Sequence, residues 1–374
     1  MTSYASPGNK SSLYATTTMA NSMDLAIPKG STVLVTGVNG FMASHVADQF
    51  VQHGYKVRGT VRNPKKSAWL NDYFDMTYGK GHLELYTVTD MTIENAYDEA
   101  VKGVSAFIHV ASVVSIDPDP EKVIPIAVES AMIAIKAAYR EPSVKRFVLT
   151  SSSAASLPVD VQILLNMNGT VLTEDSWSPD AQRLAWTPGP WGPEHGFPVY
   201  CASKVEQEQA VWKYHKENQM KRPDIMVNAV LPKLTLGKSL DPVNQGHPSS
   251  SALIPLLFEG RKLPPMWCKP QYAIDVQDAG LLHVAAAILP DVKSERIFGF
   301  AEPFCWDDVL EILRKQCPNR TFQENFAGVL FPDIVIKPRD RAEELLKRLG
   351  KPGWTSLANM VLMNTEDLRA ADTI

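Results

Sequence analysis

The sequence lacks the features that mark several large classes of protein. Its four cysteines show no CxxC spacing and its eight histidines form no ligand pattern, so we expect neither a disulfide framework nor a metal site. Cysteines without such spacing are expected to be reduced thiols, and reduced thiols indicate a cytoplasmic location. Lys plus Arg number 37 against 41 Asp plus Glu, and the net charge of -4 supplies no basic field for nucleic acid or an anionic membrane surface. No apolar run is long enough to span a membrane, so the expected partner is a small molecule.

The first 25 residues also lack targeting features. They are rich in Ser, Thr and Asn, contain no apolar signal segment, and no arginine occurs before Arg58. We therefore expect residues 1–25 to be a disordered tail. The hydrophobic content of 45% over 374 residues is enough for one large or two modest cores in the remainder.

Order is expected first in residues 31–66, "STVLVTGVNGFMASHVADQFVQHGYKVRGTVRNPKK". A β-branched strand runs into a glycine turn, a helix with apolar spacing and a second strand, which is a βαβ unit. Gly37 permits the tight turn, Gly40 allows the backbone to approach a pyrophosphate, and Ala43 keeps the helix close to the sheet. The free amides and the dipole at the helix start favour an anion. The segment predicts a dinucleotide-binding turn.

Acidic residues are absent where an NAD-binding protein would carry one. No Asp or Glu occurs between Asp48 and Asp72, so no carboxylate is available for the adenosine ribose of NAD. Arg58, Arg62, Lys65 and Lys66 instead lie on the second strand and the loop after it. Arg62 ends the second strand, where a guanidinium suits bidentate binding of the 2′-phosphate of NADP. The pattern predicts NADPH/NADP as the cofactor.

Strand and helix patterns alternate through the next 170 residues. Strands are expected at 82–90, 105–112, 145–153 and 225–232, with helical spacing between them, for example over 123–140. Such alternation predicts an α/β fold with a Rossmann-type doubly wound parallel sheet. Ligands of such sheets bind beyond the carboxyl ends of the strands. The expected cofactor-binding residues, taken from these ends and from the glycine turn, are Thr36, Gly37, Asn39, Gly40, Phe41, Met42, Arg62, Lys66, Asp90, Met91, Val110, Ala111, Ser112, Tyr200, Lys204 and Pro232.

The stretch "PVYCASKVE" places a tyrosine four residues before a lysine, in a segment with helical spacing. Tyr200 and Lys204 would then lie one turn apart on one face of the helix. A free phenol titrates near 10, and a nearby ammonium stabilises the phenolate, which makes the tyrosine a usable acid. Ser152, with Ser153 as the alternative, follows the fifth strand and would polarise a substrate oxygen. These residues are the predicted catalytic set.

Together the motifs "VLVTGVNGFMASHV", "PSVKRFVLTSS", "YCASK", "VNAVLP" and "KPGW" resemble the extended short-chain dehydrogenases/reductases, over roughly residues 29 to 360. The most similar branch holds dihydroflavonol reductases and NADPH-dependent fungal aldehyde (carbonyl) reductases. The resemblance implies catalytic roles for Ser152, Tyr200 and Lys204, a 2′-phosphate ligand in Arg62 and an adenine contact in Asp90. It implies NADPH-dependent reduction of an aldehyde or ketone, which includes ketoreductases of fungal polyketide metabolism, by a monomer or weak homodimer.

The sequence departs from that family at three positions near the expected site. Lys233 stands where similar reductases carry a small or amide side chain beside the nicotinamide. Glu129 and Met132, in "ESAM", replace the glycine and asparagine of the family's Gly-Thr-x-Asn. Substrate preference and any polar relay through that asparagine are therefore open.

The expected domains follow from this order. Residues 26–232 form the NADP-binding domain, with a long excursion over 155–199, and 271–301 return to it. A smaller mixed α/β substrate-binding domain comprises 233–270 and 302–374. The excursion holds Trp177, Trp186 and Trp191, which either wall an aromatic or apolar substrate or pack the excursion onto the sheet.

Two alternatives share the same fold. A nucleotide-sugar epimerase or dehydratase uses the same tyrosine and lysine, but such enzymes commonly favour NAD and follow the serine with a Val-Tyr-Gly-like run, where this chain has "SSSAASLP". A regulatory protein that binds NADP without chemistry tends to lose the tyrosine, and this chain retains it.

Overall fold

The structure of the protein is a computed structural model that describes residues 24–112, 116–264, 267–269, 271–326 and 332–371. Residues 1–23 of the predicted disordered tail lie outside the described residues. In the part of the chain that is described, no helix combines the length and apolar character needed to cross a bilayer.

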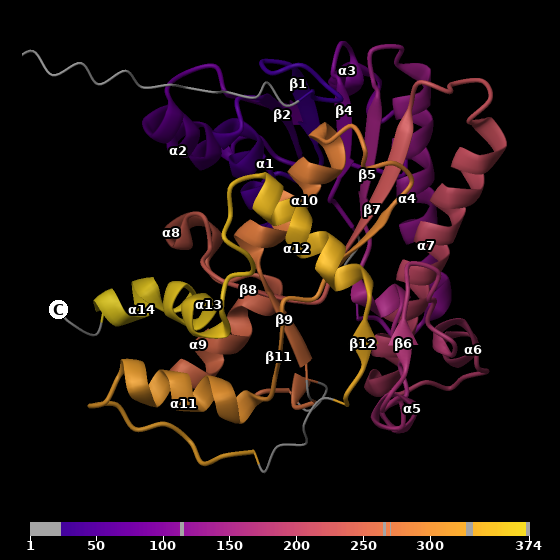
Figure 1. Cartoon of the computed structure of the whole chain (residues 1–374). Coiled ribbons are helices and arrows are strands. Elements are labelled where there is room, and N and C mark those ends of the chain that lie inside the picture. Colours follow the sequence, from indigo (N-terminus) through magenta and orange to yellow (C-terminus); the bar gives the residue numbers. More distant parts are fainter. Residues whose placement is uncertain (1–23, 113–115, 265–266, 270, 327–331, 372–374) are drawn as a thin grey trace, which may run out of the picture.

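The central layer is a seven-stranded parallel sheet, which confirms the predicted doubly wound fold (Figure 1). Its order across the sheet is β10 (Arg296–Gly299), β7 (Met226–Pro232), β5 (Arg146–Thr150), β4 (Ala106–His109), β1 (Thr32–Val35), β2 (Lys56–Val61) and β3 (Leu83–Thr87). All residues of β4, β5 and β10 are buried, as expected for strands covered on both faces. The chain reverses its direction of winding after β3, so β1 and β4 are neighbours and the crevice between them opens at their carboxyl ends.

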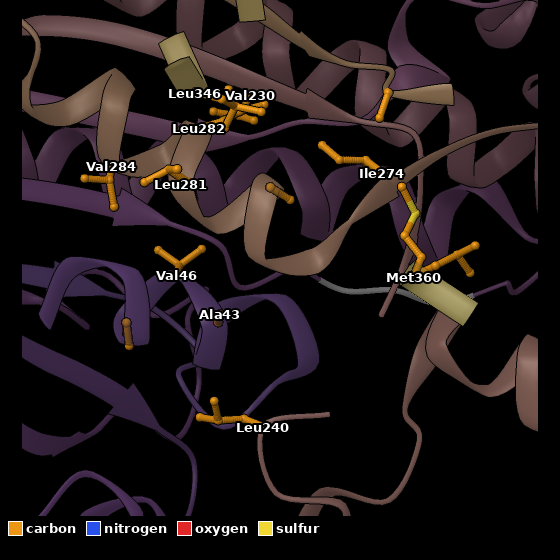
Figure 2. Packing of buried hydrophobic residues seen from close by; sticks show 14 of the residues in the cluster. Ala43, Val46, Val230, Leu240, Ile274, Leu281, Leu282, Val284, Leu346 and Met360 are labelled. Carbon is orange, nitrogen blue, oxygen red and sulfur yellow. The ribbon is translucent and has the colours of Figure 1, made fainter. Parts of the chain in front are cut away.

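Helices cover both faces of the sheet. One face carries α1 (Phe41–Gln52), α2 (Ala68–Tyr78), α10 (Val276–Ile288) and α12 (Pro338–Arg348), which share an apolar cluster. The other face carries α3 (Asp98–Val101), α4 (Pro120–Arg140) and α7 (Gly196–Asn218). Figure 2 shows Ala43 and Val46 of α1 near Leu281 and Val284 of α10. These two helices pack closely because α10 carries Gly280 at the contact, where an added Cβ would lie 3.0 Å from the His45 carbonyl oxygen.

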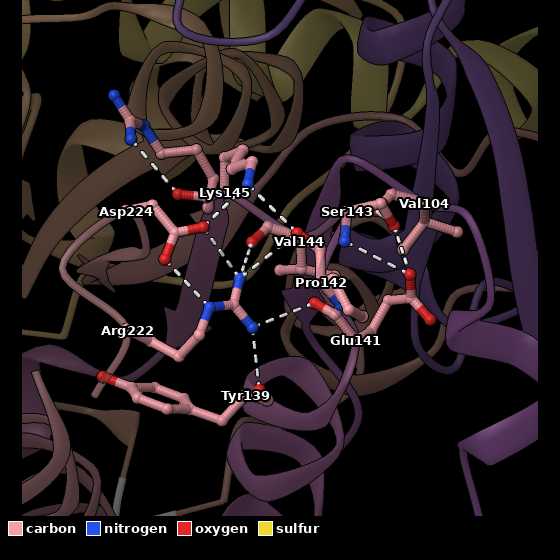
Figure 3. A network of polar contacts seen from close by, with 10 residues as sticks. Val104, Tyr139, Glu141, Pro142, Ser143, Val144, Lys145, Arg222 and Asp224 are labelled. Atoms are coloured by element: carbon pink, nitrogen blue, oxygen red, sulfur yellow. Dashed lines mark hydrogen bonds and ion pairs between the residues drawn. The ribbon is translucent and has the colours of Figure 1, made fainter.

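A polar network lies at the amino-terminal ends of β5 and β7, away from the crevice (Figure 3). The Arg222 guanidinium donates to the carbonyl oxygen of Tyr139, in the last turn of α4, at 2.8 Å and to that of Val144, which follows this helix, at 2.8 Å. It also pairs with Asp224 at 2.9 Å, and Lys145 donates to the same carboxylate at 2.7 Å. Carbonyls that α4 leaves without helical partners are thereby satisfied.

A smaller layer lies beyond the carboxyl ends of the strands of the main sheet (Figure 1). It contains the three-stranded mixed sheet β11 (Glu302–Phe304), β9 (Gln271–Asp275) and β8 (Leu234–Leu236). Its helices are α8 (Pro242–Gln245), α9 (Leu253–Phe258), α11 (Trp306–Gln316), α13 (Leu357–Asn364) and α14 (Glu366–Ala371), with the 3-10 turn η3 (Ser249–Ala252). This layer combines a mixed sheet with helices, as predicted for the smaller part of the fold.

Its boundaries differ from those expected. Strand β9 pairs with β8 and β11, so residues 271–275 belong to the smaller layer, and the return to the main layer begins only at α10. Helix α12, expected in the second domain, packs instead on the main layer. The reason is its apolar stripe, in which Ala342, Leu345 and Leu346 are fully buried.

The excursion over 155–199 is held against the main layer. It contains α5 (Val161–Leu165), β6 (Val171–Leu172), α6 (Ala181–Ala185) and η2 (Pro193–His195), and η1 (Ser153–Ala155) leads into it. Strand β6 pairs in parallel with β12 (Val335–Ile336), near the far end of the chain. Arg296 of β10 donates to the carbonyl oxygens of Glu174 and Ser176, each at 2.7 Å, and its guanidinium lies 3.9 Å from the ring centroid of Trp177.

Candidate active site

A cavity of about 1070 Å³ lies at the carboxyl ends of the main-sheet strands, between that sheet and the smaller layer. Its lining comes from the turns after β1 to β5 and β7, from the start of α7, and from the smaller layer. Most of the predicted cofactor-binding residues line it: Gly37, Asn39, Gly40, Phe41, Met42, Arg62, Asp90, Met91, Val110, Ala111, Ser112, Tyr200, Lys204 and Pro232. The crevice is where the strand order predicts a ligand.

The glycine turn after β1 has the conformation that a pyrophosphate requires. Gly37 has φ +66°, in the left-handed region, and an added Cβ would lie 3.1 Å from the Ala111 Cβ. Gly40 is the N-cap of α1, where an added Cβ would lie 3.2 Å from the Gly37 carbonyl oxygen. Helix α1 begins directly after it with unpaired amides. Backbone without side chains at a helix start fits the diphosphate of a dinucleotide.

Thr36 has a supporting place and is not among the described residues that line the cavity. It is fully buried, and its hydroxyl oxygen accepts from the amides of Val110 at 3.0 Å and Ala111 at 2.9 Å. Thr36 therefore joins the turn after β1 to the turn after β4, which are the two walls of the crevice.

The basic residues on β2 and in the loop after it have different surroundings. The Arg58 guanidinium is used within the protein, where it donates to the carbonyl oxygens of Ala100 at 2.9 Å and Lys102 at 2.8 Å. Arg62 is exposed at the end of β2, lines the cavity, and has no hydrogen bond or ion pair with any described residue. Lys66 is exposed but is not among the described lining residues. Arg62 is therefore the cation available for a 2′-phosphate.

Asp90 follows β3 at the same end of the cavity. Its carboxylate accepts from the Thr92 amide at 2.8 Å and from the Thr92 hydroxyl at 2.6 Å. Both hydrogen bonds lower the pKa of Asp90, so the residue stays ionised and can accept from an adenine amino group or a ribose hydroxyl.

The predicted catalytic residues meet in the middle of the cavity. Ser152 follows β5, and Tyr200 and Lys204 lie one turn apart near the start of α7. Ser152 lies next to Tyr200, close enough for its side chain to act on the phenol. Burial raises the pKa of Tyr200, and the neighbouring Ser152 side chain acts in the opposite direction. The phenol is therefore protonated at neutral pH, as a proton donor must be.

Lys204 is nine-tenths buried and directed by two oxygens. Its ammonium donates to the Ser112 hydroxyl at 3.1 Å and to Gln207 Oε1 at 3.4 Å. Burial lowers the pKa of Lys204 to about 8, and the carboxylate of Glu208 acts to raise it. Gln207 is itself fixed, because its amide nitrogen donates to the Ala127 carbonyl oxygen at 3.1 Å. Lys204 thus keeps its charge at neutral pH in a fixed place.

Gln207 supplies a polar contact to Lys204, although the family's asparagine is replaced in this sequence. Glu129 and Met132, which replace the family's glycine and asparagine, are not among the described lining residues, and Met132 packs against an apolar cluster. The amide side chain that reaches Lys204 comes from α7 instead of α4. It lies three residues after Lys204, a helical spacing that could have identified it in the sequence.

A buried ion pair supports the catalytic helix. Glu208 is fully buried on α7, and Arg296 of β10 donates to its carboxylate at 2.6 Å. The hydroxyl of Ser151, the residue before Ser152, donates to the same carboxylate at 2.6 Å. The same arginine holds the excursion, so one guanidinium connects β10, the catalytic helix and the loop that covers the substrate side.

The tryptophans of the excursion pack rather than wall the cavity. None of them is among the described lining residues. Trp177 lies under Arg296, Trp186 donates to Glu206 at 2.9 Å on the surface, and Trp191 stacks on His195 with ring centroids 5.6 Å apart. The apolar wall is built from other residues: Ile126, Leu157, Val159, Phe197 and Trp267.

The smaller layer contributes polar residues to the cavity as well. Lys233, singled out from the sequence, lines it together with Lys269 and Gln271. Neither Lys269, Gln271 nor Trp267 was predicted as a site residue, because each lies in a loop or at a strand start without a motif. Their place depends on how the second layer docks.

Comparisons with known proteins agree with this geometry. Residues 33–162 match the family model described as the NAD dependent epimerase/dehydratase family. The chain is 39% identical to aldehyde reductase 2 of Sporidiobolus salmonicolor, over 95% of this chain and 100% of that protein. It is also 39% identical to the ketoreductase adrE of Penicillium rubens, over 91% of this chain and 97% of that protein. Among solved structures, Gre2 of Candida albicans in complex with NADPH superposes with a TM-score of 0.76 at 23% identity, over 92% of this chain and 99% of that one.

Proposed function

Because this chain belongs to the NAD-dependent epimerase/dehydratase family of extended short-chain dehydrogenases/reductases, we propose that it is an NADPH-dependent reductase of aldehydes or ketones. Two relatives that it matches over nine-tenths of its length at 39% identity are named aldehyde reductase and ketoreductase. Those names favour reduction over the epimerase or dehydratase alternative, and the intact tyrosine and lysine favour an enzyme over a regulatory protein.

The residues at the nucleotide end fit NADPH. The turn at Gly37 and Gly40 would hold the diphosphate, Arg62 the 2′-phosphate, and Asp90 the adenosine. NADPH, when bound, supplies a hydride to the carbonyl carbon of the substrate. Lys66 does not line the cavity, so any contribution it makes would be through charge at longer range.

The residues in the middle of the cavity would control the proton and the charge. Tyr200 donates its phenolic proton to the carbonyl oxygen as negative charge develops there. Ser152, which lies next to Tyr200, donates to the same oxygen and orients it. Lys204 stabilises the phenolate that forms, and its ammonium is positioned to bind the nicotinamide ribose. The meeting of Ser152, Tyr200 and the buried Lys204 in one cavity carries the proposal.

Tyr200→Phe tests it directly. We expect kcat to fall about a thousandfold, because the proton donor is lost, with the Kd for NADPH unchanged. Turnover is followed by NADPH oxidation with aromatic aldehydes and β-ketoesters, and affinity by titration of cofactor fluorescence. Tyr214→Phe, on the same helix but away from the cavity, is the matched control and should retain activity. Retention of more than a tenth of the wild-type kcat by Tyr200→Phe would contradict the assignment.

The finer properties of the protein are also proposals. We propose an apolar or aromatic body for the substrate, which the wall formed by Leu157, Phe197 and Trp267 supports. The cytoplasmic location rests on the cysteines, all four of which are free thiols. The monomeric or weakly dimeric state is implied by the family resemblance, and light scattering after size-exclusion chromatography would test it.

A further inference from the structure

Lys233 brings a cation into the carbonyl end of the cavity. It follows Pro232 at the end of β7, and its amide donates to the Gly299 carbonyl oxygen at 3.0 Å, so the backbone is fixed where the chain passes from the main sheet to β8. Its ammonium donates to Gln271 Oε1 at 2.7 Å, and Gln271 is 6% exposed. Lys233 is close enough to Cys201, the neighbour of Tyr200, for the two to affect each other's pKa. The cation therefore lies near the catalytic tyrosine.

This cation has no carboxylate partner among the described residues. No Asp or Glu of the described ranges lies within ion-pair distance of Lys233 or of Lys269, which lines the same end. Asp180 also acts on Cys201, but its carboxylate accepts from the amides of Val159 and Asp160, each at 2.9 Å. A lysine in such a place is costly unless something pairs with it.

The charged side chains that line this end of the cavity, Lys233 and Lys269, are hydrogen-bond donors. Lys233 uses one of its three protons on Gln271, and the amide nitrogen of Gln271 must point away from that contact because its oxygen accepts it. Burial lowers the pKa of Lys233 to about 8, with Lys269 acting in the same direction, so the ammonium remains charged at neutral pH. Two ammonium groups beside an apolar wall match an anion attached to an apolar body.

We propose that the substrate carries a carboxylate, which binds to Lys233 and Gln271 while its aldehyde or ketone group lies at Tyr200. The substrate class is thus an oxo-carboxylic acid with an apolar or aromatic body. This inference rests on the proposed function, since it names the substrate of the same site. Lys233 would determine specificity, and Lys269 would add to the attraction without direct contact.

The test compares acids with their neutral esters. The probes are 3- and 4-formylbenzoate and the corresponding methyl formylbenzoates, and the readout is the acid-to-ester ratio of kcat/KM with NADPH. We expect the wild type to prefer at least one acid, and Lys233→Met to lower that ratio about tenfold to a hundredfold, as for loss of a charged hydrogen bond. Lys233→Arg should retain most of the preference, because it keeps the charge. Lys262→Met, exposed and outside the lining residues, is the matched control and should leave the ratio unchanged.

A binding measurement separates this inference from the proposed function. Calorimetric titration of the NADP-loaded protein with the unreactive 4-methylbenzoate should show binding that Lys233→Met weakens about tenfold or more. If no aldehyde is consumed but this Lys233-dependent binding is present, the reductase proposal fails and the anion site stands. Equal use of acid and ester by the wild type, or a ratio that Lys233→Met leaves unchanged, would overturn the carboxylate inference even if reduction is efficient. Thermal unfolding of each variant checks that it is folded.

Discussion

The two ends of the cavity are built in different ways. The nucleotide end is made of short turns that directly follow β1, β2, β3 and β4, and each turn contributes neighbouring residues. The carbonyl end is assembled from the excursion over 155–199, from Lys233 after β7, and from Trp267, Lys269 and Gln271 of the smaller layer. The first end needs only the parallel sheet, whereas the second needs three distant segments to dock on one another.

This difference locates the weak points of the site. Arg62 is exposed and has no hydrogen bond or ion pair with any described residue, so a change there should affect the cofactor alone. Arg296 holds Glu208, Ser176 and Trp177 at once, so a change there should disturb the carbonyl end and the fold together. We order the predictions by the size of the expected effect.

The largest effect is expected when the carbonyl end loses its buried ion pair. Arg296→Met should lower the free energy of unfolding by about 3 to 5 kcal/mol, because it leaves the fully buried Glu208 carboxylate unpaired. Urea unfolding followed by circular dichroism measures the loss. Arg348→Met, which removes a partly exposed pair with Asp291, is the matched control and should cost about 1 kcal/mol or less.

A double-mutant cycle sharpens that result. Adding Glu208→Gln to Arg296→Met should recover part of the lost stability, since the remaining neutral amide costs less to bury than an unpaired carboxylate. A loss below 1 kcal/mol for the single Arg296→Met variant, or strictly additive effects in the cycle, would show that this pair does not hold the carbonyl end.

At the nucleotide end, Arg62→Ala should leave stability unchanged and alter cofactor choice. We expect the Kd for NADPH to rise about tenfold to a hundredfold and the Kd for NADH to change little, because only NADPH carries the 2′-phosphate. Fluorescence titration with both cofactors measures the ratio. Lys66→Ala, a nearby cation outside the lining residues, should change it much less. Equal weakening of both cofactors would count against the proposed phosphate site.

The smallest effect concerns Lys204, where the two ends meet. The pKa of Lys204 is lowered to about 8, so its positive charge is present below that pH and lost as the pH rises through it. We expect kcat/KM for NADPH, which reports the free enzyme, to be flat near pH 7 and to fall about tenfold per pH unit well above 8. Lys204→Arg should abolish this limb because arginine does not titrate there. A profile of the wild type that stays flat to pH 10 would assign no titration to Lys204.

The nucleotide end was largely predictable from the sequence, and the reason is local. Gly37, Arg62 and Asp90 each lie within three residues of the end of a strand, and strand ends can be read from apolar runs. Thr36 and Lys66 are the two predicted cofactor contacts that do not line the cavity. Strand patterns predict the direction of a side chain poorly near a turn. Tyr200 and Lys204 were predictable as a pair because helical spacing puts them on one face.

The carbonyl end was not predictable to the same extent. Trp177, Trp186 and Trp191 were open between wall and packing, and they pack, while Trp267 lines the cavity from a loop without any motif. The expected domain boundary also differed from the structure. Strand β9 belongs to the smaller layer because it pairs with β8 and β11, and these pairings depend on tertiary contacts that the sequence does not reveal.

The sequence by itself determined the parallel sheet, the glycine turn with its basic neighbour, and the tyrosine and lysine on one helical face, since all of these depend on periodicity and on contacts a few residues apart. Only the tertiary structure decided that Lys204 meets the Ser112 hydroxyl, that Arg296 joins the excursion to the catalytic helix, and that Lys233 meets Gln271 inside the cavity. These contacts join residues from separate elements, and their partners are chosen by the packing of two layers whose apolar faces must be buried together.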